Sequence, residues 1–140
     1  MSLRVEIEWS YTGPGEESLE FSRVLYAYLH PGTNKILYVG KADRCSVYER
    51  LRGSHKEAIF SDIIEDLGLS TLHAIVGSLS LPSERKLSSE LLADVESLLI
   101  MELQPTYNTQ SRQSRISRPG LVLKCSGDWP LRVKTFKDEL

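Results

Sequence analysis

The sequence has little cysteine: Cys45 and Cys125 are the two in 140 residues, and neither has a second cysteine or a histidine at the spacing of metal ligands. A zinc site is therefore not expected. The first residues, MSLRVEIEW, lack the basic start and apolar centre of a secretory signal, and no long uncharged apolar run is present. These absences predict a reduced, cytoplasmic protein with no membrane partner.

The sequence also has little net charge, formally −2 at pH 7. Such a balance argues weakly against a protein built to hold a polyanion. The distribution is uneven, however, because seven lysines and arginines against three acids from Thr109 onward give +4 and leave −6 on residues 1–108. Any contact with nucleic acid must therefore be local.

Period-two patterns and turn residues predict the strands. Residues 4–9 alternate charged and apolar side chains, which is typical of a strand with one face in water. The runs 24–30 and 35–41 surround a turn-forming Pro-Gly-Thr-Asn segment and predict a β-hairpin. Residues 71–79 are rich enough in β-branched side chains for a third core strand.

Helical patterns occupy two further segments. Residues 54–67 begin with a capping-box spacing and end before Gly68, with a short helical turn expected over 46–52. A longer helix is expected from about 88 to 103, stopped before Pro105. The order of elements predicts an α/β (α+β) fold. We expect a small central sheet, antiparallel or mixed, of three core strands that begins with the hairpin and is flanked by helices. β extensions at the N- and C-terminal ends enlarge it, and residues 121–124 and 131–136 would form a second hairpin at the C-terminal end.

One residue of the longer helix does not fit its surroundings. Leu92, Val95, Leu99 and Leu103 form an apolar stripe, and Glu96 lies within it, about 40° around the helix from Leu92. A carboxylate taken out of water without a partner costs several kcal/mol. Glu96 should therefore be paired, bound to a cation or placed at the rim of a cleft. A position at the edge of the stripe, from which the carboxylate reaches water, or a salt bridge to a nearby arginine would satisfy it without any function.

The hairpin places tyrosines together. With residues 31–33 as the loop, Tyr26 and Tyr38 fall opposite each other on neighbouring strands. Gly40 then follows on the same face as Tyr38, which predicts a small polar pocket where the backbone could approach a ligand. Aromatic side chains on a sheet are also common in cores, so packing is the alternative.

Taken together, these features resemble the GIY-YIG nuclease family over roughly residues 23–109. The spacing of twelve residues from Glu96 to Asn108 is similar to that in the nuclease domain of the bacterial excision-repair incision subunit. In chain order the matching features are Val24-Leu25-Tyr26, Tyr38-Val39-Gly40 with Lys41, Arg50 in ERLRGSH, Glu96, and Pro105-x-Tyr107-Asn108. The first glycine of the family name is Val24 here.

The resemblance implies a metal-dependent endonuclease that hydrolyses DNA phosphodiester bonds. In this interpretation Glu96 binds one Mg²⁺ or Mn²⁺, and Arg50 neutralises charge in the transition state. One of Tyr26 and Tyr38 acts as general base, and the positive charge of Lys41 or of the metal would favour its phenolate form. The sequence leaves open which tyrosine does so.

Further contacts with nucleic acid are expected on the same basis. Asn108 would tie the junction after the long helix either to the site or to the substrate. Backbone phosphates would be contacted without readout of base sequence by Lys41, Arg52, His55, Arg112, Arg115 and Arg118. A solvated loop is the alternative for the last three.

The expected organisation is one domain with two extensions. Residues 23–109 form the nuclease-like part, residues 1–22 an N-terminal extension, and residues 110–140 a basic loop and hairpin packed on the same domain. Because no separate DNA-binding segment is present, targeting to DNA would come from the chain's own extensions, from a second copy or from a targeting partner. The alternatives are a catalytically inactive module of the same fold that binds nucleic acid or protein, and an ordinary α/β domain with a salt-bridged Glu96.

Overall fold

The computed structural model describes residues 3–12, 23–42, 54–82, 87–108 and 120–138. The fold is α+β, as the order of elements predicted, with one mixed six-stranded sheet in the order β3-β2-β4-β1-β5-β6. The elements are β1 (Leu3–Thr12), β2 (Val24–Leu29), β3 (Ile36–Ala42), α2 (Ser54–Leu67), β4 (His73–Ser80), α3 (Ser89–Leu103), β5 (Leu121–Gly127) and β6 (Thr135–Lys137).

The two ends of the chain contribute strands to this same sheet. β1 lies in its middle, antiparallel to β4 and parallel to β5, while β5 and β6 pair as the antiparallel hairpin expected near the C-terminus. β2 pairs with both β3 and β4. The segments expected as N- and C-terminal extensions therefore form strands of the same sheet as the first hairpin. The two edge strands of the described sheet are β3 and β6.

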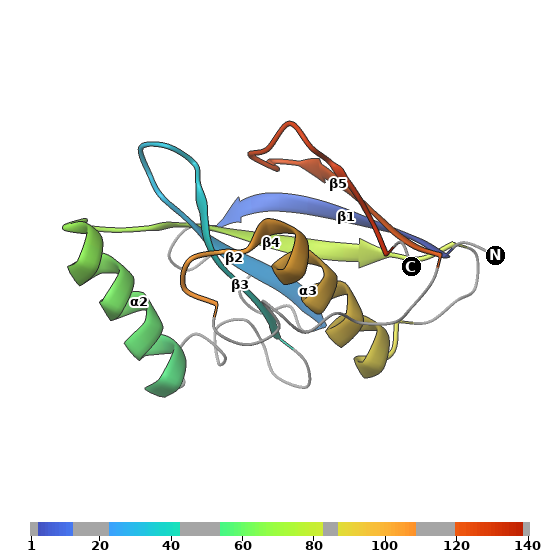
Figure 1. The fold of residues 1–140 in the computed structure, drawn as a ribbon, viewed down its shortest axis with the longest axis horizontal. Coiled ribbons are helices and arrows are strands. Elements are labelled where there is room, and N and C mark those ends of the chain that lie inside the picture. Colours follow the sequence, from blue (N-terminus) through green and yellow to red (C-terminus); the bar gives the residue numbers. More distant parts are fainter. Residues whose placement is uncertain (1–2, 13–22, 43–53, 83–86, 109–119, 139–140) are drawn as a thin grey trace.

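The sheet carries a separate core on each face. α3 lies across one face (Figure 1) and packs its apolar stripe, including Leu92, Val95 and Leu99, against alternate residues of the strands. Trp9 and Trp129 stack in this core with ring centroids 5.2 Å apart. α2 packs Ile63 and its neighbours against the other face, over β2, β3 and β4. In Figure 1, α2 lies at the opposite side of the view from β5.

Local signals set the ends of both helices where the sequence places them. Ser88 caps α3, because its hydroxyl accepts a hydrogen bond of 3.0 Å from the backbone N–H of Leu91. Gln104 ends the helix in the left-handed conformation just before Pro105. Gly68 ends α2 with a φ of +65°, which glycine adopts at little cost.

The register of the first hairpin differs from the expected one. Tyr28, not Tyr26, lies opposite Tyr38, and Tyr26 lies opposite Gly40. Two irregularities produce the change. The backbones of His30 and Lys35 bond across a turn longer than 31–33, and a bulge shifts the register again after Tyr28. Because each adds one residue, the two together move the pairing by two positions, so Tyr26, Tyr38 and Gly40 still share one face. The bulge places Ile36 on the opposite face from Tyr38, although simple alternation would put the two together.

Across the described ranges, no helix is both long enough and apolar enough to cross a membrane.

Candidate functional site

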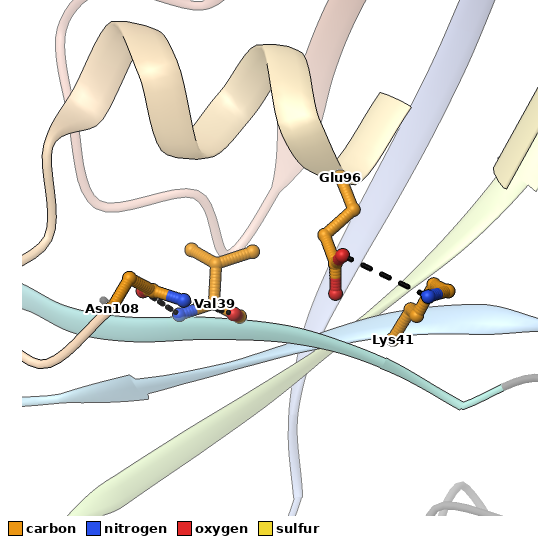
Figure 2. Close-up of polar contacts among 4 residues, drawn as sticks. All are labelled: Val39, Lys41, Glu96 and Asn108. Carbon is orange, nitrogen blue, oxygen red and sulfur yellow. Dashed lines mark hydrogen bonds and ion pairs between the residues drawn. The ribbon is translucent and has the colours of Figure 1, made fainter. Parts of the chain in front are cut away.

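The edge strand β3 brings a lysine under the long helix. Glu96 points from α3 toward β3, and its Oε1 lies 3.9 Å from Nζ of Lys41 (Figure 2). The side chains keep 18% and 31% of their surface exposed, so the pair sits at the rim of the core. The apolar neighbours Leu92, Val95 and Leu99 anchor the helix here, which explains why a carboxylate is held in an otherwise apolar stripe. Lys41 is therefore one partner of Glu96, where the sequence predicted pairing, a bound cation or a place at the rim of a cleft.

This ion pair is weakly held. Its separation exceeds the 2.7–2.9 Å typical of a charge-assisted hydrogen bond. At such exposure, an ion pair contributes about 0–1 kcal/mol, because water screens both charges. Lys41 can therefore turn from Glu96 to another anion at small cost.

The outer edge of β3 is covered by the turn that follows α3. The amide of Asn108 pairs with Val39 in both directions: the Val39 N–H donates to Oδ1 over 2.9 Å, and Nδ2 donates to the Val39 carbonyl over 2.8 Å (Figure 2). The N–H of Tyr107 donates to the carbonyl of Leu37. Asn108 thus substitutes for a neighbouring strand and joins the turn to β3. The junction after α3, which was expected to be tied by Asn108 to the site or to the substrate, is tied to β3.

The tyrosines lie on the other face of β3. Side chains alternate along a strand, so Tyr38 and Gly40 face α2 whereas Val39 and Lys41 face α3. Tyr26, Tyr28 and Tyr38 form one aromatic group, with ring centroids 5.9–6.2 Å apart. Tyr26 is 1% exposed and Tyr38 is 5% exposed. The structure thus unites Lys41, Glu96 and Asn108 around one strand and gathers the tyrosines behind it.

The space beside Gly40 is filled. A Cβ added at this position would lie 2.5 Å from Cζ and Oη of Tyr26, the residue paired with it on β2. The prediction of an open pocket beside Gly40, where the protein backbone could approach a ligand, is therefore wrong. Gly40 is required because any side chain at this position would collide with the ring of Tyr26.

Tyr28 was not among the expected site residues, although it is the direct cross-strand partner of Tyr38. Burial, with a smaller effect from the nearby Tyr38, raises the pKa of Tyr28 far above its usual range. Its ring packs edge to face on Phe60 of α2 at 5.5 Å. Its place on the tyrosine face follows from strand alternation, but its pairing with Tyr38 depends on the bulge and could not be read from the sequence.

Several predicted residues lie beyond what can be described. Arg50, Arg52, Arg112, Arg115 and Arg118 fall outside the described ranges. His55 belongs to α2, but its side chain is not among those described.

A hard divalent cation fits this site through a single protein ligand. Mg²⁺ favours carboxylate oxygens and keeps several of its waters, so one carboxylate at a partly exposed rim is a compatible donor. Glu96 supplies that carboxylate. Among the described residues, no group of three or more histidine, cysteine, aspartate or glutamate side chains could hold a metal ion.

Comparison with protein-family models, with curated proteins and with solved structures gives no significant match to this chain.

Proposed function

We propose that this protein is a metal-dependent endonuclease of the GIY-YIG type that hydrolyses DNA phosphodiester bonds. The observation that carries the proposal is the meeting of Glu96 with Lys41, two residues of the motif that come from elements 55 positions apart in the sequence. Under this proposal β2, β3 and β4 are the three core strands of the family fold, with the hairpin first. β1, β5 and β6 then enlarge the sheet beyond that core.

Each proposed role follows from the chemistry of phosphodiester hydrolysis. Attack by water places extra negative charge on the phosphate, and this charge must be neutralised. Lys41 would bind a non-bridging phosphate oxygen after turning from Glu96, and Arg50 would add a forked donor. Glu96 would hold Mg²⁺ or Mn²⁺, which supplies further positive charge when bound.

The general base is the most demanding role. Tyr38 is a better candidate than Tyr26, because it belongs to the same strand as Lys41 and retains slightly more exposed surface. To act as the base, Tyr38 must be a phenolate, and its oxygen must reach water at the edge of β3 to accept a proton. Asn108 acts as a positioning residue, since its amide holds Val39 and thereby the strand that carries both Tyr38 and Lys41.

The first experiment is a gel assay of the purified protein on supercoiled plasmid and on branched DNA, with Mg²⁺ or Mn²⁺ and with EDTA. Glu96→Gln keeps the shape of the side chain and removes its charge, so we expect at least a 100-fold loss of nicking. Tyr38→Phe removes only the proposed base and should have a similar effect. Glu102→Gln, an exposed change of the same kind on the same helix, is the matched control and should cleave normally.

A second function is favoured by the burial of the tyrosines and their position behind β3. It is a catalytically inactive module of the same fold, in which Glu96 and Lys41 form a structural pair and the tyrosines are core. In that case no DNA is cleaved in any metal, while Glu96→Gln leaves binding of a nucleic acid or protein unchanged. Cleavage by the native protein with full activity in Glu96→Gln would reject both assignments for this residue.

A further inference from the structure

The strand at the far edge of the sheet has one side of its backbone directed outward. β6 is last in the strand order and pairs with β5 alone among the described strands. The N–H of Cys125 donates to the carbonyl of Lys134, and the N–H of Asp138 donates to the carbonyl of Leu121. Since the direction of backbone groups alternates along a strand, those of Thr135 and Lys137 point away from β5. β6 therefore offers an edge for one more strand.

A groove of about 810 Å³ runs beside this edge. Leu103 at the end of α3 forms one wall, and Leu131 and Val133 from the segment before β6 contribute further apolar surface. Val133 is 61% exposed, more than the other exposed large hydrophobic residues of the described chain. An apolar side chain of an added strand would find partners here that water does not provide.

Within the described part of the chain, the charges around the groove are mostly positive. Arg132, Lys134 and Lys137 are exposed, whereas the nearby Asp138 is buried. Among the lining residues that the structure describes, Glu102 is the one carboxylate. Two copies of the protein joined through β6 would bring their cations together, which disfavours a second copy as the occupant. An anionic partner is favoured instead.

We infer that β6 is a docking edge for an extended acidic peptide of a partner protein, which adds to the sheet as a further strand. The outward backbone groups of Thr135 and Lys137 would form hydrogen bonds with the peptide backbone, and the apolar side chains of the peptide would pack against Val133 and Leu131. Acidic side chains would face Lys137 and Arg132. A nucleic-acid strand could use the same cations, but it would use neither the outward carbonyl groups nor the exposed Val133.

The lysines also explain why the edge would be selective. A short edge strand that carries lysine resists pairing with unrelated chains, because an apolar or basic strand would bury the charge without compensation. An acidic strand would instead compensate the lysine charge with its own carboxylates. β6 and β3 are opposite edges of the sheet, so this surface can be tested independently of Glu96 and Lys41.

The probe is a fluorescein-labelled ten-residue peptide of alternating glutamate and valine, titrated with the full chain and followed by anisotropy. Thr135→Pro removes the outward N–H without touching the bonds to β5, and proline is tolerated at such an edge position. We expect it to weaken binding at least tenfold. Thr135→Val, which keeps the N–H, should bind as the native protein does. Lys137→Glu should also weaken binding at least tenfold and shift the preference to a lysine-valine peptide.

Three results would overturn the inference. Equal binding by the native protein and Thr135→Pro would show that the edge is not used. Tighter binding of a 20-base-pair duplex than of the peptide, lost in Lys137→Glu and kept in Thr135→Pro, would assign the surface to nucleic acid. A dimer in light scattering that dissociates in Thr135→Pro would assign it to a second copy.

A measurement on the native chain guards against misfolding of the proline variant. Near-ultraviolet circular dichroism of the stacked Trp9 and Trp129 reports whether Thr135→Pro keeps its core. If it does not, amide NMR of the native protein decides the question. Addition of the peptide should shift the amide signals of Thr135 and Lys137 and slow their hydrogen exchange, and unchanged signals would refute the docking edge.

Discussion

Replacement of Asn108 by alanine tests whether one side chain holds the candidate site together. Its amide makes two hydrogen bonds to the backbone of Val39, both buried. Each is worth about 0.5–1.5 kcal/mol net, and a buried group that loses its partner costs about 1–3 kcal/mol. Partial access of water to the vacated edge offsets some of this loss. We therefore expect the free energy of unfolding to fall by about 2–4 kcal/mol, equivalent to roughly 10 °C in Tm for a domain of this size.

The assay is urea unfolding followed by tryptophan fluorescence, beside two companion variants. Thr106→Ala changes an exposed residue of the same turn and should stay within about 0.5 kcal/mol of the native protein. Asn108→Asp keeps the acceptor for the Val39 N–H but turns an oxygen toward the Val39 carbonyl. The introduced carboxyl can donate to that carbonyl only when protonated, so this variant should regain stability as the pH falls. A loss below 1 kcal/mol in Asn108→Ala would show that the turn does not hold β3.

Two further predictions concern the tyrosine face. Gly40→Ala should lower the free energy of unfolding by about 1–3 kcal/mol, because the added Cβ meets the ring of Tyr26. In a Tyr26→Leu background the same change should cost much less. If the two substitutions instead have additive effects in urea unfolding, the contact is contradicted. The raised pKa of Tyr28 means that the folded state binds this proton more tightly than the unfolded state, so the associated stability is complete below about pH 10 and is lost as the pH rises above it. Tyr28→Phe should therefore lose less stability than the native protein between pH 9 and 11 in urea unfolding, and an equal loss would show that Tyr28 ionises normally.

The features that could be predicted from the sequence depend on near neighbours. Ser88 and Pro105 mark the ends of α3 within a few residues of the turns they affect, and both ends were confirmed. Gly68 does the same for α2. The position of Glu96 in an apolar stripe predicted a partner, because the helical period alone fixes which side chains share a face. These signals need no knowledge of the rest of the chain.

The features that failed depend on distant pairing or on backbone irregularity. The central place of β1 requires its parallel pairing with β5, which joins Leu3 to Leu121. No local pattern specifies that partner. The predicted register of the hairpin is wrong because the turn is longer than expected and a bulge adds one more residue. No residue type in the sequence marks the position of that bulge. The two hydrogen bonds of Asn108 to Val39 likewise span 69 positions.

The arrangement around β3 narrows where chemistry could take place. Glu96 and Lys41 face α3, the tyrosines face α2, and the turn at Asn108 covers the edge between them as far as Val39. A phosphate that contacts both groups must therefore lie around the edge beyond Val39, at the end of β3 that carries Lys41. Loss of cleavage in both Glu96→Gln and Tyr38→Phe would place the reacting phosphate across that edge. Loss in Glu96→Gln alone would place the general base on the α3 face and leave the tyrosines as the core that fixes the strand.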